Sequence, residues 1–81
     1  MKKTILVIED EEAINDVISM SLRATGYEAV SFFDGDDASA SLENRHDYDC
    51  AVVDVMLPGK DGFELLPELL KYEIPVIFLT A

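Results

Sequence analysis

Three carboxylate side chains stand directly after two apolar runs of the sequence. The run 5–8 is followed by Glu9 and Asp10, and the run 50–53 is followed by Asp54. Short apolar runs of this kind are typical of strands buried on both faces of a parallel sheet. Open α/β sheets bind their ligands outside the carboxyl ends of the strands. Glu9, Asp10 and Asp54 are therefore expected to meet at one edge of a sheet.

Carboxylates held this close repel one another unless a cation neutralises them. Magnesium is the expected cation, because it prefers oxygen ligands and uses one or two carboxylates together with phosphate. Zinc is poorly served, since the sequence has one cysteine and one histidine. A carboxylate beside magnesium can attack phosphorus and form an aspartyl phosphate, and Asp54 is the candidate nucleophile. A hydroxyl from Thr80, at the end of a later apolar run, could donate a hydrogen bond to that phosphoryl group.

Other phosphate and metal signatures do not fit. A calcium loop starting at Asp34 would need glutamate at its twelfth position, where Arg45 stands. No glycine-rich phosphate loop follows the first apolar run. Phosphatases with an aspartate nucleophile carry a second aspartate two residues later, where this sequence has Met56. Cys50 is expected to be a small buried hydrophobe, and His46 a solvated surface residue.

Length and charge limit the classes of function. The 81 residues suffice for one domain, 1–81, and no apolar run approaches the roughly 20 residues of a membrane span. Six basic and seventeen acidic residues give a net charge of −11, which disfavours direct contact with nucleic acid and attracts cations. The single cysteine excludes an internal disulfide and fits a reducing cytoplasm.

Periodicity and turn residues predict strands that alternate with helices. The expected strands are Thr4–Ile8, Tyr27–Phe32, a third that starts near Cys50 and ends at Asp54, and Val76–Leu79. The expected helices run from Glu11 to about Thr25, from a cap at Asp34 or Asp36 to about Arg45, and over about Phe63–Lys71. This order implies right-handed crossovers and a parallel sheet, with Tyr27–Phe32 at an edge.

Two of the helices have features that can be checked. The first carries apolar residues at the i, i+3, i+4 spacing, namely Ala13, Ile14, Val17, Ile18 and Leu22. Gly26 is its expected C′ residue. Pro67 lies inside the third helix, where it removes a backbone hydrogen bond, so a kink or a late helix start is expected.

Three segments, 5–12, 54–66 and 75–81, closely resemble the receiver domain of two-component response regulators. The resemblance implies a flavodoxin-like fold, a parallel sheet of strand order 2-1-3-4-5 with helices on both faces. It also implies that a sensor histidine kinase transfers a phosphoryl group to Asp54 and that this switches an output. The loop from Met56 to Gly62 looks most similar to receivers attached to winged-helix transcription factors.

The same resemblance implies roles for the remaining site residues. Asp10 and Asp54 would bind magnesium directly, Glu9 would bind it through water, and Met56 would contribute its backbone carbonyl. Thr80 would be the switch hydroxyl that turns toward the phosphoryl group. Glu9 departs from the pattern, because this family more often has aspartate there.

The resemblance also predicts an incomplete receiver that lacks the last helix, strand and helix. The missing strand would bear a lysine that pairs with the phosphoryl group, and Lys60 and Lys71 lie in the wrong segments to replace it. We expect at most self-phosphorylation and self-dephosphorylation, and no other enzyme activity. An open edge at Val76–Leu79 and an uncovered sheet face predict self-association.

Three hypotheses stay open from the sequence. The first is a phosphoacceptor receiver domain that uses magnesium. The second is a receiver fragment that binds itself or a partner without being phosphorylated. The third is a small magnesium-dependent phosphatase, which Met56 disfavours.

Overall fold

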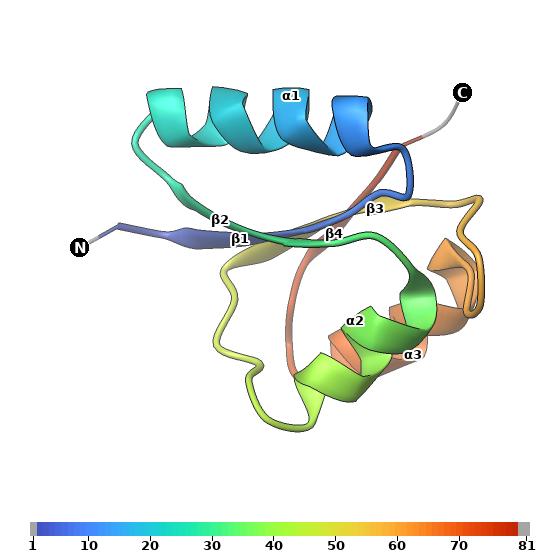
Figure 1. Ribbon diagram of the computed structural model, residues 1–81. Coiled ribbons are helices and arrows are strands. Elements are labelled where there is room, and N and C mark those ends of the chain that lie inside the picture. Colours follow the sequence, from blue (N-terminus) through green and yellow to red (C-terminus); the bar gives the residue numbers. More distant parts are fainter. Residues whose placement is uncertain (1, 80–81) are drawn as a thin grey trace.

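The computed structural model describes residues 2–79, in which four strands alternate with three helices (Figure 1). The elements are β1 (Thr4–Ile8), α1 (Glu12–Ala24), β2 (Glu28–Phe32), α2 (Gly35–Leu42), β3 (Cys50–Asp54), α3 (Gly62–Lys71) and β4 (Val76–Leu79). The predicted order is confirmed. No helix within this range has both the length and the apolar character needed to cross a membrane.

All strand pairs are parallel, and the sheet order is β2-β1-β3-β4. α1 lies on one face of the sheet, whereas α2 and α3 lie together on the other (Figure 1). This is the flavodoxin-like arrangement expected from the sequence, with β2 at an edge. The carboxyl ends of β1 and β3 are neighbours because these two strands pair directly.

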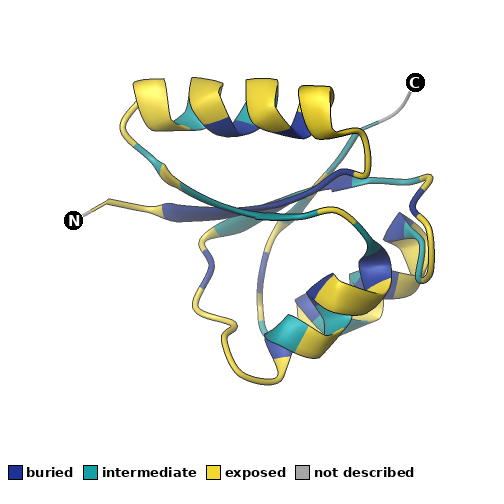
Figure 2. Cartoon of the chain, viewed as in Figure 1, coloured by how far each residue is buried: buried dark blue, intermediate teal, exposed yellow. Residues whose placement is uncertain are grey.

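The core lies between the sheet and the pair α2 and α3. It is formed by alternate residues of β1 and β3 together with residues of both helices and the following loops: Leu6, Ile8, Ala38, Leu42, Tyr48, Ala51, Val53, Leu57, Leu65, Leu69 and Ile74. Figure 2 shows the buried residues concentrated in the central strands and on the inner sides of these helices. Burial of this apolar surface is the main force that holds α2 and α3 in place.

The buried face of α1 only partly matches the one that its apolar spacing predicts. Its fully buried residues are polar, Asn15 and Ser19, and Ile18 and Leu22 beside them are half-buried. Ile14 and Val17 are 41% and 63% exposed. The reason is hydrogen bonding: Asn15 and Ser19 bond to groups of β2 and of the chain after β1. Gly26 follows the helix at a φ of 102°, as expected of a C′ residue.

One helix boundary differs from the prediction, and the late helix start that Pro67 could have caused does not occur. α2 ends at Leu42 instead of near Arg45, and the amide of Arg45 donates to the Ser41 carbonyl in a closing turn. α3 begins at Gly62, so Pro67 does not delay its start. Asp61 and Glu64 form a capping box at that start, and buried leucines anchor the helix on the sheet. These interactions outweigh the hydrogen bond that the proline removes.

The α1 face of the sheet is covered unevenly. Val7, Val52 and Ile77 occupy one register row across β1, β3 and β4. Val7 is fully buried, Val52 is half-buried, and Ile77 is 58% exposed. Among the described residues, cover on this face therefore decreases from β1 to β4.

Candidate functional site

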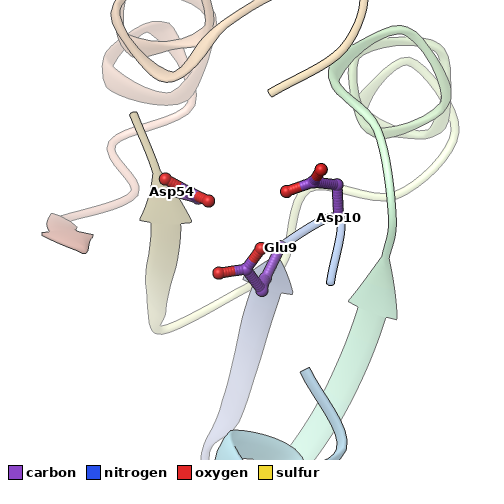
Figure 3. A group of neighbouring side chains, drawn as sticks. All are labelled: Glu9, Asp10 and Asp54. Carbon is purple, nitrogen blue, oxygen red and sulfur yellow. The ribbon is translucent and has the colours of Figure 1, made fainter. Parts of the chain in front are cut away.

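The three predicted carboxylates meet at one end of the sheet. Glu9 and Asp10 follow β1, Asp54 ends β3, and one carboxylate oxygen of each lies within 4.8 Å of the others. Figure 3 shows the three side chains converging from the two strand ends. Glu9 is buried, Asp54 is half-buried and Asp10 is exposed. The pairing of β1 with β3 thus brings together residues that lie more than forty positions apart in the sequence.

Backbone amides orient two of these carboxylates. The amide of Glu11 donates to Glu9 Oε2 at 3.0 Å, and the amide of Met56 donates to Asp54 Oδ1 at 3.0 Å. Each carboxylate therefore uses one oxygen to hold its own orientation. Among the described residues, no protein group donates to the second oxygen of Asp54, so that oxygen is free to take part in chemistry.

The electrostatics of the site favour a cation. The surface depression around the carboxylates is lined by Glu9, Asp10, Glu11, Ile14, Ile18, Asp54, Met56 and Leu79, with no lysine or arginine among them. Burial raises the pKa of Glu9, and the neighbouring groups of Asp10 and Asp54 raise it further, against the lowering effect of the Glu11 amide. Carboxylate oxygens without a positive side chain nearby are the donor set that magnesium prefers.

The loop after Asp54 is held from two sides. The amide of Gly62 donates to the Val55 carbonyl at 3.0 Å, and the amide of Gly35, at the start of α2, donates to the Pro58 carbonyl at 3.1 Å. Gly62 leaves no space for a side chain, because an added Cβ would lie 2.6 Å from the Asp54 carbonyl oxygen. Close packing of backbone on backbone therefore fixes the path of the chain beyond Asp54.

The other predicted site residues have different outcomes. The Met56 side chain is 79% exposed at the rim of the depression, and the role of its carbonyl stays a prediction. Thr80 lies outside the described residues. Lys60 lies away from the carboxylates, because its ammonium group bonds to Ser39 and Glu68.

Two residues predicted to lie outside the site do so. Cys50 is half-buried at the start of β3, and burial raises the pKa of its thiol. His46 is exposed, as expected, but its ring also stacks on Tyr72 with 4.1 Å between ring centroids. Neither residue belongs to the carboxylate cluster.

Sequence reasoning missed Asn15. Its side chain is fully buried and donates to the backbone carbonyl of Glu9 at 3.1 Å. The signal in the sequence was a polar residue one helical turn after Glu11, inside a helical segment whose apolar spacing includes its neighbours but not Asn15 itself.

Comparison with known proteins gives consistent matches. Residues 5–81 match the response regulator receiver domain family. A response regulator receiver domain from Francisella is 33% identical, with a TM-score of 0.90 over 99% of this chain and 67% of its own. The receiver domain of the hybrid histidine kinase CckA is 40% identical, with a TM-score of 0.83 over 93% of this chain and 72% of its own.

A third solved structure bears on the cation. It is the receiver domain of a sensor histidine kinase from Pseudomonas aeruginosa PAO1, with a magnesium ion coordinated in its active site cleft. It is 34% identical and has a TM-score of 0.88 over 100% of this chain and 69% of its own. The chain therefore spans about two thirds of the length of these similar structures.

Proposed function

The chain belongs to the response-regulator receiver domain family, which serves as phosphoacceptor in two-component signalling, and we propose that Asp54 is its phosphoacceptor. The observation that carries this proposal is the convergence of Asp54 with Glu9 and Asp10 at the carboxyl end of the sheet. Receiver domains are generally phosphorylated by histidine kinases and are generally not enzymes. Of the three carboxylates, Asp54 is the one that ends β3 and leads into the anchored loop.

The proposed transfer uses the free oxygen of Asp54. Asp54 Oδ2 attacks the phosphorus of a phosphohistidine, so that an O–P bond forms as the P–N bond breaks. The imidazole nitrogen keeps the electron pair of the broken bond, and the histidine leaves as neutral imidazole with its proton on the other ring nitrogen. Meanwhile the Met56 amide holds Asp54 Oδ1, which fixes the direction from which the second oxygen attacks.

Magnesium is the proposed cofactor. Glu9, Asp10 and Asp54 would hold it, with the Met56 backbone carbonyl as a further ligand, and the donor set of this structure fits because it consists of oxygens without a nearby positive side chain. When bound, magnesium offsets negative charge on the oxygens of the transferring phosphoryl group. Thr80 is the proposed switch hydroxyl.

We propose that the chain accepts one phosphoryl group per molecule and does not turn over a substrate. At most it would phosphorylate and dephosphorylate itself, because neither Lys60 nor Lys71 lines the depression around Asp54. Lys60 is bound to Ser39 and Glu68, and Lys71 lies over the ring of Tyr72. These contacts support the proposal that neither Lys60 nor Lys71 pairs with a phosphoryl group on Asp54.

We propose a cytoplasmic setting, a sensor histidine kinase as donor, and a transcriptional output without nucleic-acid contact by this segment. The net charge of −11 supports the proposal that this segment does not contact nucleic acid, because it would repel DNA. We also propose self-association through β4 or the uncovered sheet face. The exposure of Ile77 supports this second proposal.

Intact mass spectrometry tests the phosphoacceptor. The protein is incubated with magnesium and phosphoramidate, whose P–N bond resembles that of phosphohistidine. We expect a mass gain of one phosphoryl group that hydroxylamine removes, as it removes acyl phosphates. Asp54→Asn should abolish the gain while its amide oxygen still accepts from Met56. Asp16→Asn, which removes an exposed carboxylate of α1, should leave the gain intact. A full gain in Asp54→Asn would overturn the proposal.

A further inference from the structure

We propose that Asn15 is a positioning residue for the cation site, acting on the peptide that joins Glu9 to Asp10; this inference rests on the proposed function. Asn15 Nδ2 donates to the Glu9 carbonyl and to the Phe32 carbonyl, each at 3.1 Å. One amide group of α1 thus bridges the carboxyl ends of β1 and β2 at the point where the chain turns toward the carboxylates.

The bridge supplies a donor that the sheet does not. The last bond of the β1–β2 ladder runs from the Glu9 amide to the Phe32 carbonyl at 3.2 Å. Beyond it the two chains separate, and within residues 2–79 Asn15 is the one group that donates to the Glu9 carbonyl. Without Asn15 this buried carbonyl would lose its partner, and the peptide between Glu9 and Asp10 could rotate.

Rotation of that peptide matters because it would move the two charged side chains attached on either side of it. Glu9 and Asp10 lie on either side of it, and their carboxylates approach Asp54 within 4.8 Å. Like charges at this distance repel, so the cluster separates unless the backbone resists. A fixed Glu9 carbonyl holds both side chains in the arrangement that a cation needs before the cation arrives.

Asn15 differs from an ordinary packing residue because both polar atoms of its buried side chain are hydrogen-bonded. Its side chain has no exposed surface, both of its carbonyl contacts are made by Nδ2, and Oδ1 accepts from Ser19 Oγ at 3.2 Å. Ser19 in turn bonds to Ser31 of β2 at 2.8 Å. Ser19 and Ser31 join α1 to β2, and only Asn15 reaches the chain that carries the carboxylates.

The variants Asn15→Ala and Ser19→Ala separate positioning from anchoring. Both remove buried hydrogen bonds between α1 and the sheet, and both should lower the unfolding temperature. Only Asn15→Ala removes the donor to Glu9. The magnesium dissociation constant is measured by calorimetric titration without phosphodonor, at a temperature where circular dichroism shows each protein folded. We expect Asn15→Ala to raise it about tenfold, the lower end of the range for groups that orient metal ligands. Ser19→Ala should leave it within about twofold of the wild type.

Equal magnesium dissociation constants for the wild type and Asn15→Ala would overturn the inference and leave Asn15 as an anchor of α1. If Asn15→Ala does not fold, Asn15→Ser takes its place, because its short side chain cannot span both carbonyls. Absence of magnesium binding by the wild type would also overturn it. The phosphoacceptor proposal fails in a different measurement, when no phosphoryl group is gained at Asp54. A tenfold loss of magnesium affinity in Asn15→Ala would support the inference about Asn15 whatever that measurement shows.

Discussion

Gly35 of α2 packs directly against the backbone of Lys60, in the loop that follows β3. A Cβ added to Gly35 would lie 1.6 Å from the Lys60 carbonyl oxygen, and the Gly35 amide already donates to Pro58. The start of α2 and the loop beyond Asp54 are therefore in backbone contact. This contact joins the core on one face of the sheet to the chain that leaves the carboxylate site.

Replacement of Gly35 by alanine should disturb both stability and the site. The added methyl group would strike backbone, which cannot swing away, so we expect a loss of about 3 kcal/mol, at the upper end for overpacking. Because the loop must shift, magnesium affinity should fall as well. Urea denaturation measures the first effect and calorimetric titration the second.

Gly26→Ala is the matched control for that variant. Gly26 has a φ of 102°, and nothing lies within 4 Å of an added Cβ. Gly26→Ala should therefore lower the free energy of unfolding by about 1–2 kcal/mol, from backbone strain alone. Magnesium affinity should not change, since Gly26 follows α1 at the end remote from Asp54. Equal losses of magnesium affinity in the two variants would contradict the proposed contact between α2 and the site.

A polar cluster of Ser39, Lys60 and Glu68 should make stability depend on pH. Lys60 Nζ lies 3.1 Å from Glu68 Oε2, and the Ser39 hydroxyl donates to Glu68 Oε1. Burial alone would raise the pKa of Glu68, but the bonds from Ser39 and Lys60 outweigh it, so the pKa is lowered. A carboxyl with a lowered pKa stabilises the fold above its ordinary value of 4.5, and this contribution is lost as the pH falls through the folded pKa.

Glu68→Gln should therefore be less stable than the wild type at pH 7 by about 0.5–1 kcal/mol, a discounted value because the pair is partly exposed. The difference should shrink as the pH falls toward 3. Thermal unfolding at several pH values measures it. Asp47→Asn, which breaks the more exposed pair with Arg45, should have a smaller effect. If the stability difference between Glu68→Gln and the wild type grew as the pH fell, the predicted lowering of the Glu68 pKa would be wrong.

The exposed end of the α1 face should control self-association. Ile77→Lys places a charge on the register row that runs from Val7 through Val52, so two copies could no longer bury this surface. We expect sedimentation velocity to show a shift toward monomer. Leu70→Lys changes a similarly exposed residue, 57%, on α3 across the sheet, and should leave association unchanged. Association that survives Ile77→Lys would place the contact elsewhere.

Much of the site was predictable because it follows from topology. Glu9, Asp10 and Asp54 end apolar runs, and paired parallel strands bring such ends together. The buried face of α1 was only partly predictable from apolar spacing, since hydrogen bonds of Asn15 and Ser19 to β2 and to the chain after β1 help to decide it. Asn15 is buried while Val17 is exposed, the reverse of their hydrophobicity. The ligand role of the Met56 carbonyl and the switch role of Thr80 come from the resemblance and stay predictions.

Glu9 should oppose folding at neutral pH until a cation binds. Burial and the nearby Asp10 and Asp54 groups raise its pKa above the ordinary 4.5. The folded protein therefore binds this proton more tightly than the unfolded chain, and the contribution of Glu9 to stability declines as the pH rises from below 4.5 through the folded pKa. Glu9→Gln stays neutral throughout, and its amide oxygen can still accept from the Glu11 amide.

Without metal, Glu9→Gln should thus be more stable than the wild type at pH 7, by roughly 0.5–1 kcal/mol, and the gain should vanish near pH 4. With magnesium the order should reverse, because the wild type gains stability from binding and the variant loses a charged ligand. Thermal unfolding with EDTA and with magnesium measures both effects. Glu12→Gln, which removes an exposed charge of α1, should show neither. If Glu9→Gln gained as much from magnesium as the wild type does, Glu9 would have no part in holding the cation.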